Sequence, residues 1–241
     1  MRVFDVAAPS VVSIVNYKTE AGVRVAEAVG TGVVWDAFGH IVTNYHVIAN
    51  VDKAMLPLLT KVLVSDATGR NVTECSVELA GADALHDLAV LRIVGTDGAG
   101  VDASGSGDGG GGASGPPPPL TPIRLGRSAD LKVGQYTFAI GSSFGLSRTL
   151  SAGVVSGLDR SIPSPVGTRI YGVVQTDAAI NAGNSGGPLL DSSARLVALN
   201  TATFTRSGTG RGSGVNFALP ADLLADVVPK LIVYGNAMGK S

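Results

Sequence analysis

Residues 176–190 read Thr-Asp-Ala-Ala-Ile-Asn-Ala-Gly-Asn-Ser-Gly-Gly-Pro-Leu-Leu, and they are the most informative stretch of the chain. Glycines flank Ser185 on both sides, and the segment lies between two strand-like runs. Small residues allow backbone N–H groups to converge beside a hydroxyl, which is how an oxyanion hole is built. Glycine-rich turns that contain serine are also common hairpin connections. Ser185 is therefore a candidate nucleophile that needs a base and an orienting carboxylate from elsewhere in the chain.

The composition favours a β-rich chain. The 241 residues include 33 glycines and 12 prolines, with 5% aromatic and 15% charged residues, which is typical of many short strands joined by turns. This length allows one large domain or two small ones. The formal net charge of −1 provides no basic surface for nucleic acid and no polybasic face for anionic lipid, so we expect neither partner.

The single cysteine, Cys75, excludes an intramolecular disulfide, and we expect a small strand residue rather than a reactive thiol. No apolar run approaches the roughly 20 residues that span a bilayer, and the N-terminus lacks a signal-like pattern. We expect a soluble chain from which any targeting peptide has already been removed.

Turn residues and β-branched runs predict the strands. In the first half, a strand at 9–16 is followed by a polar connection at 18–28, then by a hairpin with arms 30–35 and 40–44 that leads into residues 45–48. His46 therefore lies just past a strand end. Other strands are predicted at 61–65, 73–80, 85–93, 122–125 and 136–141, and near 149–157, 169–175, 187–190, 195–201 and 214–219. Pro220 begins a terminal helix, which Pro229 should bend or interrupt before Gly235.

Residues 95–122 differ from their surroundings, because they consist mainly of glycine, serine and aspartate and include a run of four prolines. Such a segment cannot pack a core, so we expect a mobile surface insertion with a stiffer polyproline end. A proline-rich ligand for an SH3-like partner is the alternative interpretation.

These elements predict an all-β fold, a double β-barrel with a C-terminal helix, because each half holds about half a dozen short strands. We assign residues 1–125 to the first barrel, including the insertion 95–122, residues 126–220 to the second barrel, and residues 221–235 to the helix. Only six residues follow Gly235, too few for another domain.

The three histidines are the candidates for a base. His40 follows a turn glycine and is most simply a hairpin residue. His86 directly precedes Asp87, and neighbouring side chains at a strand entry diverge, so these two should not bond each other. His46 ends a strand at a position from which a side chain can enter a cleft. A core histidine whose ring nitrogens are hydrogen-bonded is the alternative interpretation of this position.

Asp87 stands at the head of the apolar run 88–91, and a carboxylate there is costly unless it is hydrogen-bonded. An imidazole would satisfy it, and a strand-capping role is the alternative. The order His46, Asp87, Ser185 is that of the chymotrypsin-like double barrel, which carries base and acid in the first barrel and the nucleophile in the second.

The chain also resembles the HtrA/Deg serine endopeptidases. The resemblance extends over nearly the whole chain, and the segments that carry it are, in order, 30–35, 39–48, 87–91, 139–141, 175–181 and 183–188. Residues 200–206, 214–218 and 231–235 look most like the chloroplast lumenal Deg branch that has no PDZ domain. The resemblance therefore implies a single trypsin-like protease domain without a PDZ domain, and it implies neither a cofactor nor a metal.

The resemblance also implies site roles. His46 would be the general base, Asp87 its orienting carboxylate and Ser185 the nucleophile on a peptide carbonyl. Backbone N–H groups of Gly183 and Ser185, together with Asn184, would stabilise the oxyanion. The substrate side-chain pocket would be lined by Ala179, Ile180, Asn200, Thr201 and Ala202. Because no acidic residue stands at its expected base, the resemblance implies a preference for small or medium apolar side chains.

Two departures from the family pattern stand out. Residues 142–145 read Ser-Ser-Phe-Gly where many members have Asn-Pro-Phe-Gly, and the insertion 95–122 is much longer than the family connection. Family members are usually trimers whose active-site loops switch between ordered and collapsed states, and the glycine- and serine-rich residues 206–214 would suit such a loop.

The resemblance implies an ATP-independent endopeptidase that acts on unfolded or damaged proteins in the thylakoid lumen. It would be a homotrimer or a hetero-oligomer with a sister Deg subunit, and at most peripheral to the thylakoid membrane. One alternative is an inactive or holdase-like partner subunit that binds extended polypeptides. A second is a structural β-barrel interaction module that displays the proline-rich segment.

Overall fold

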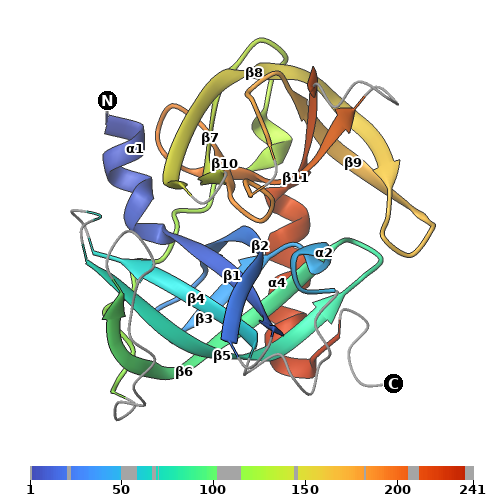
Figure 1. Ribbon diagram of the computed structural model, residues 1–241. Coiled ribbons are helices and arrows are strands. Elements are labelled where there is room, and N and C mark those ends of the chain that lie inside the picture. The colour runs from blue at the N-terminus through green and yellow to red at the C-terminus, as the bar shows by residue number, and fades with distance from the viewer. Residues whose placement is uncertain are drawn as a thin grey trace.

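The structure is a computed structural model that describes residues 2–20, 23–49, 59–66, 69, 71–101, 115–143, 146–181, 183–205 and 212–236. Two closed β-barrels lie one above the other, and the chain passes once from the first to the second (Figure 1). The predicted all-β double barrel with a C-terminal helix is confirmed. Among the described helices, none is long and apolar enough to cross a membrane.

The first barrel closes in the order β1-β2-β3-β6-β5-β4. Its strands are β1 (Val11–Glu20), β2 (Val23–Val34), β3 (His40–Thr43), β4 (Thr60–Ser65), β5 (Val72–Asp83) and β6 (Leu88–Val101). Inward-facing branched side chains such as Ile14, Ile41 and Leu91 are completely buried in its centre. Side chains alternate between the interior and the exterior along each strand, and the interior ones form this core.

The second barrel closes in the order β10-β11-β12-β9-β8-β7. Its strands are β7 (Tyr136–Ser143), β8 (Leu146–Pro163), β9 (Arg169–Thr176), β10 (Pro188–Leu190), β11 (Leu196–Thr205) and β12 (Gly212–Pro220). Alanines such as Ala139, Ala198 and Ala218 are fully buried around Leu189 and Val155. Small residues among larger ones let the strands fill a narrow barrel interior.

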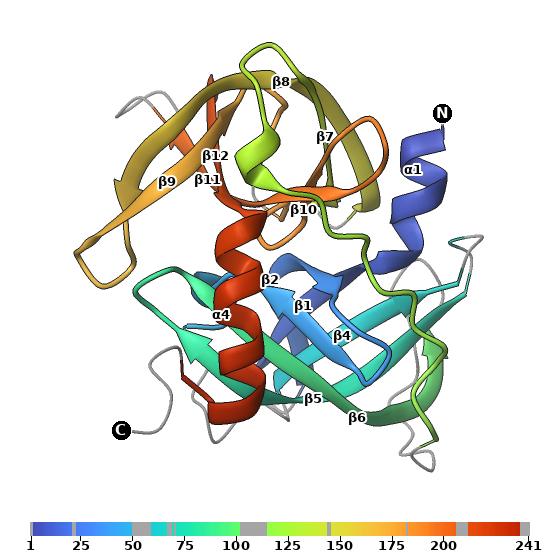
Figure 2. The same cartoon turned by 180° about the vertical axis from the view of Figure 1, so that it is seen from behind.

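The helical elements are α1 (Arg2–Ala7), η1 (Ala8–Ser10), α2 (Tyr45–Ile48), η2 (Ser128–Asp130) and α4 (Ala221–Tyr234). Helix α4 runs from the second barrel down across the first (Figure 2), and it contacts β5, β6, β11 and β12. Its buried residues Leu224, Val228 and Leu231 join the core that links the two barrels. Gly81 permits this approach, because a Cβ there would overlap the backbone of Leu231.

The helix differs from the sequence expectation at Pro229. It continues through this proline to Tyr234 as one element, and ends where Gly235 adopts a left-handed φ of 76° and donates its N–H to the Leu231 carbonyl at 3.0 Å. Packing of Val228 and Leu231, on either side of the proline, holds the helix on the barrels despite the backbone donor that proline lacks.

The prediction of a polar connection at 18–28 is also wrong. Strands β1 and β2 continue through it as a long hairpin, with Lys18 opposite Val25 and Glu20 opposite Val23. Arg24 supports the hairpin, because its guanidinium lies 2.7 Å from the Glu74 carboxylate and 4.2 Å from the ring centroid of Tyr17. Paired polar strands of this kind have no apolar alternation to reveal them in the sequence.

The segment expected to be an insertion begins later than predicted. Strand β6 continues past Gly95 to Val101 and stays paired with β5, and Thr96 forms a bridge to Gly115. Residues 102–114 lie outside the described residues, as do 206–211 of the segment proposed to switch.

Candidate active site

His46 lies on α2, a single helical turn that follows β3. Asn44 precedes the turn in an extended conformation, and its carbonyl accepts the N–H of Val47 at 3.3 Å. The turn packs directly on β2, because Gly30 has no side chain: a Cβ there would come within 2.5 Å of Val47 Cγ1. The His46 side chain stays 40% exposed. The helical turn that follows the predicted hairpin arm therefore places an accessible imidazole at the edge of the first barrel.

Asp87 lies on the turn between β5 and β6 and is buried, with 3% of its surface exposed. Its backbone has a left-handed φ of 55°, which is uncommon outside glycine, asparagine and aspartate. One carboxylate oxygen lies 2.8 Å from His46 Nδ1, and the other accepts the His46 backbone N–H at 2.9 Å. Because a carboxylate only accepts, this contact assigns the proton to Nδ1 and leaves His46 Nε2 as the acceptor.

Further bonds hold Asp87 in place. Thr201 donates its hydroxyl to the oxygen that faces His46, at 2.7 Å. The Asp87 carbonyl accepts the Asn44 side-chain amide at 3.0 Å and the Tyr45 N–H at 3.1 Å. The bonds from Thr201 and from the backbone N–H and ring of His46 compensate the buried charge of the carboxylate, as its burial requires.

Each of the other two histidines pairs with a different aspartate. His40 Nδ1 is 2.7 Å from an Asp36 carboxylate oxygen on its own hairpin turn, and His86 Nδ1 is 2.5 Å from one of Asp83. His40 is thus a hairpin residue and His86 does not bond Asp87, as the sequence predicted.

Ser185 stands on the turn between β9 and β10. Gly183 and Gly186 beside it adopt φ angles of 98° and 83°, so both glycines serve conformations that other residues adopt only under strain. The Ser185 hydroxyl donates to the Thr201 carbonyl at 3.3 Å. Thr201 therefore connects the serine with the His46–Asp87 pair, since its hydroxyl bonds Asp87. Among the described residues, no hydrogen bond joins the Ser185 hydroxyl to His46.

The structure modifies the predicted oxyanion hole. The Asn184 N–H donates to the Asn181 carbonyl at 3.0 Å inside the turn, which removes it as an oxyanion donor in this conformation. Within the described part of the chain, the backbone N–H groups of Gly183 and Ser185 make no hydrogen bond. These two groups are the donors that a developing oxyanion could meet.

The predicted pocket residues have different environments. Ala179 is exposed, while Ile180 is 2% exposed. Asn200 is fully buried and donates its side-chain amide to the Pro188 carbonyl at 3.1 Å, and its own N–H and carbonyl bond Gly187 and Gly186. The Asn200 side chain therefore supports the turn that carries Ser185.

Thr201 and Ala202, the other predicted pocket residues on β11, differ from Asn200. The Thr201 hydroxyl is directed to Asp87, so this side chain supports the acid instead of forming a wall. The side chain of Ala202 lies outside the described residues, although its backbone belongs to β11. Nothing in the sequence distinguished Thr201 from its neighbours on the same strand.

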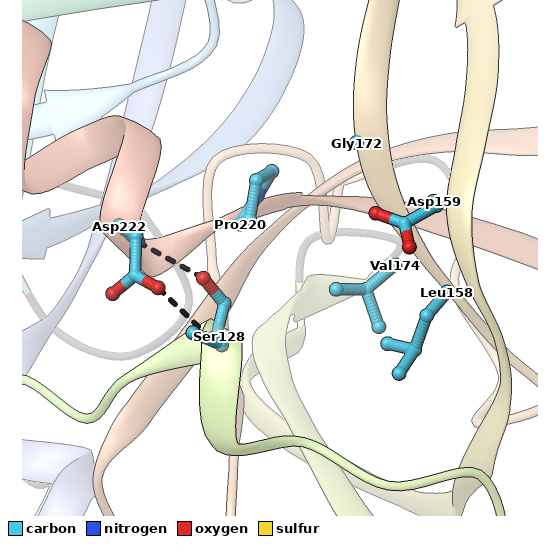
Figure 3. Close-up of a pocket in the computed structure, with 8 residues that line it drawn as sticks. Ser128, Leu158, Asp159, Gly172, Val174, Pro220 and Asp222 are labelled. Atoms are coloured by element: carbon cyan, nitrogen blue, oxygen red, sulfur yellow. Dashed lines mark hydrogen bonds between the residues drawn. The ribbon is translucent and has the colours of Figure 1, made fainter.

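A cavity of about 280 Å³ lies elsewhere, between the second barrel and the start of α4 (Figure 3). Its lining residues are Ser128, Ala129, Leu158, Asp159, Gly172, Val174, Pro220 and Asp222, none of which belongs to the site described above. Asp222 is fixed at its rim by bonds to Ser128 and Ala129. Among the described residues, no group of three or more histidine, cysteine or acidic side chains could hold a metal ion.

Comparison with known proteins adds independent information. A family model described as "Trypsin-like peptidase domain" matches residues 30–199. Protease Do-like 5, chloroplastic, of Arabidopsis thaliana is 49% identical over 88% of this chain and 59% of that protein. Protease Do-like 1, chloroplastic, of the same plant is 41% identical over 98% of this chain and 48% of that protein. The chain thus spans about half the length of these relatives.

Solved structures agree with the sequence comparisons. A crystal structure of Deg5 has a TM-score of 0.73 and 43% identity, covering 98% of this chain and 95% of that one. The HtrA-type protease AlgW with a tripeptide has a TM-score of 0.72 and 32% identity, covering 98% and 65%. Two six-stranded barrels, with a histidine–aspartate pair on the first and a glycine-flanked serine on the second, define the chymotrypsin-like class of fold. The chain belongs to the trypsin-like peptidase domain family, within its HtrA/Deg group of serine proteases.

Proposed function

We propose that this chain is an ATP-independent serine endopeptidase that cleaves unfolded or damaged proteins through an acyl-enzyme intermediate. The observation that carries the proposal is the buried Asp87 carboxylate, 2.8 Å from His46 Nδ1 and joined through Thr201 to Ser185. This arrangement fixes the tautomer of the neutral imidazole, with the proton on Nδ1 and none on Nε2. A base in this state can remove the proton of a serine hydroxyl.

The reaction would follow the acyl-transfer sequence of such sites. Rotation of the Ser185 side chain away from the Thr201 carbonyl would bring its hydroxyl to His46 Nε2, which takes the proton as the oxygen attacks a peptide carbonyl. The N–H groups of Gly183 and Ser185 would hold the oxyanion. His46 would then protonate the departing amine, and water would hydrolyse the acyl-enzyme by the same base.

For substrate choice, we propose that the apolar Ile180 and the small Ala179 line a pocket for small or medium apolar side chains. Side chains from other strands hold two carbonyls of this segment by hydrogen bonds. Asn216 donates to the Ala178 carbonyl at 2.8 Å, and Ser151 donates to the Ala179 carbonyl at 2.7 Å. A wall held by such hydrogen bonds favours a pocket that is formed before substrate binds.

The biological setting is proposed from the relatives, two of which are named as chloroplastic. A role in thylakoid protein quality control, in the lumen, fits this similarity. We further propose a homotrimer or a hetero-oligomer with a sister Deg subunit. Light scattering of the purified protein, alone and mixed with such a subunit, tests the assembly: a monomer under both conditions would contradict it.

A second candidate function is an inactive or holdase-like partner subunit. The bond from the Ser185 hydroxyl to the Thr201 carbonyl favours it, because that hydroxyl is not directed to His46. Such a subunit would bind extended polypeptides without cleaving them.

Labelling with a fluorophosphonate and turnover of β-casein separate the two candidates. We expect the wild type to form an adduct on Ser185 and to cleave casein, and Ser185→Ala to do neither. Ser193→Ala is the matched control, because this serine is exposed on the turn between β10 and β11. Binding of casein without adduct or cleavage in the assembled protein would support the holdase and overturn the endopeptidase.

A further inference from the structure

Thr31 lies on β2 of the first barrel and is completely buried where the two barrels meet. Its hydroxyl donates to the Gly183 carbonyl at 2.6 Å and accepts the Ser142 N–H at 2.9 Å. Its backbone N–H donates to the Ser185 carbonyl at 2.9 Å. One residue of the first barrel thus holds both ends of the segment 183–185 in the second.

These bonds fix the peptide plane between the two proposed oxyanion donors. The C=O and N–H of a trans peptide point in opposite directions. In the peptide that joins Gly183 to Asn184, the carbonyl is held by Thr31 and the N–H by the Asn181 carbonyl at 3.0 Å. The plane is therefore pinned on both sides. A change of ψ at Gly183 or of φ at Asn184 would alter the relative direction of the N–H groups of Gly183 and Ser185, which lie in the two adjoining peptides.

The surroundings of Thr31 are shaped to receive its side chain. A Cβ on Gly141 would come within 3.0 Å of the Thr31 hydroxyl, and one on Gly187 within 3.0 Å of its methyl group. A Cβ on Gly186 would overlap its carbonyl oxygen, which accepts the Thr43 hydroxyl at 2.7 Å. Three glycines thus pack against Thr31, although Asn184 and the Ile140 carbonyl would lie nearer to a Cβ at Gly141 and Gly187. Each polar group of Thr31 has a hydrogen-bond partner.

We propose that Thr31 is a positioning residue for the oxyanion hole: its hydroxyl holds the segment 183–185 in the conformation that aims two N–H groups at the reacting carbonyl. This inference rests on the proposed function of Ser185. The hydroxyl does not touch substrate, so it acts on the transition state through Gly183 and leaves substrate binding unchanged.

The test compares Thr31→Val, which keeps the shape and removes the hydroxyl, with Thr31→Ser, which keeps the hydroxyl. Turnover of a peptide substrate gives kcat and KM, and inhibition by a peptide aldehyde reports the oxyanion hole, because the aldehyde forms a tetrahedral adduct with the serine. We expect Thr31→Val to lose about 10²-fold in kcat, the typical result of misplaced catalytic groups, with KM within about threefold of wild type. Aldehyde affinity should fall in parallel, and Thr31→Ser should recover most of both.

Thr96→Val is the matched control, since Thr96 is a buried threonine of the same barrel whose hydroxyl accepts the Gly115 N–H at 3.0 Å. It should keep wild-type kcat and aldehyde affinity. A folded Thr31→Val with kcat and aldehyde affinity within threefold of wild type would overturn the inference. Thr31→Ala replaces it if the valine variant does not fold, with the same criterion. A wild type that neither cleaves peptide nor reacts with fluorophosphonate would overturn the proposed function, and this inference with it.

Discussion

The hydroxyl of Thr201 lies 2.7 Å from the Asp87 carboxylate oxygen that also faces His46 Nδ1. The two residues come from different barrels, so this bond crosses the boundary between them. Thr201 is 4% exposed, and its carbonyl is the acceptor for the Ser185 hydroxyl. A residue that the sequence assigned to the pocket wall therefore orients the acid and receives the resting serine.

Removal of this hydroxyl should reduce the rate. Thr201→Val leaves the buried carboxylate with one donor fewer, and a hydrogen bond to a charged group contributes about 1.5–3 kcal/mol. We expect kcat to fall by about 10- to 100-fold, with KM little changed. Thr201→Ser should restore the bond and most of the rate. Steady-state kinetics on a peptide substrate measure this, and equal kcat values for the valine and serine variants would show that the bond does not matter for catalysis.

Replacement of the acid should be more severe. In Asp87→Asn the amide can donate to Nδ1, which favours the wrong imidazole tautomer, and a loss of about 10⁴-fold in kcat is typical of this change in a Ser-His-Asp triad. Asp36→Asn is the matched control, because Asp36 makes a similar 2.7 Å contact with His40 on an exterior turn. Casein turnover should distinguish the two variants. Comparable activity in both would remove Asp87 from its proposed role.

The sequence predicted the parts of this site that depend on local pattern. The hairpin before His46 and the strand after Asp87 are marked by apolar runs and turn residues, and the glycines around Ser185 by their spacing. What it missed depends on tertiary contacts. Asn200 and Thr201 are neighbours on one strand, yet one bonds Pro188 beneath the turn and the other Asp87 across the barrels. Alternation along β11 shows that such side chains diverge, but it does not show which partner each one meets.

The same distinction explains the errors in the fold. The polar extension of the first hairpin is stabilised by Arg24 and Glu74, which are far apart in the sequence. The helix through Pro229 is held by packing on both barrels. Local propensity predicted a connection and a break at these two places, and tertiary packing overrode both.

Two glycines with similar backbone angles should respond very differently to alanine. Gly186 and Gly134 have φ angles of 83° and 90°, so both substitutions carry the strain of a left-handed residue, about 1–2 kcal/mol. At Gly134 a Cβ would have no neighbour within 4 Å, whereas at Gly186 it would overlap the Thr31 carbonyl and the Thr43 hydroxyl. We expect Gly134→Ala to lower Tm by a few degrees and keep activity. Gly186→Ala should lower Tm further and abolish activity, and similar Tm and activity in the two variants would contradict the close approach.

Asp222, in the first turn of α4, should make stability depend on pH. Burial alone would raise the pKa of its carboxyl, but the N–H of Ala129, 2.8 Å away, and bonds to Ser128 outweigh this effect and hold the pKa below its ordinary value. A lowered pKa in the folded state stabilises the protein above the pKa of the unfolded chain, about 3.9, and the stabilisation is lost as pH falls through the folded value.

Asp222→Asn removes this charge and keeps an oxygen that can accept the Ala129 N–H. At pH 7 we expect it to lower Tm by about 1–3 °C, a small effect because the residue is exposed to solvent. The difference from wild type should begin to shrink as pH falls below about 4, because the unfolded chain is then protonated at Asp222, and it should vanish once the pH lies below the lowered pKa of the folded carboxyl. In a Ser128→Ala background, where one donor is missing, the effect of Asp222→Asn at pH 7 should be smaller. Thermal unfolding at pH 7, 4.5 and 3 measures each difference, and a Tm difference that is the same at all three would show that the charge of Asp222 does not stabilise the start of α4.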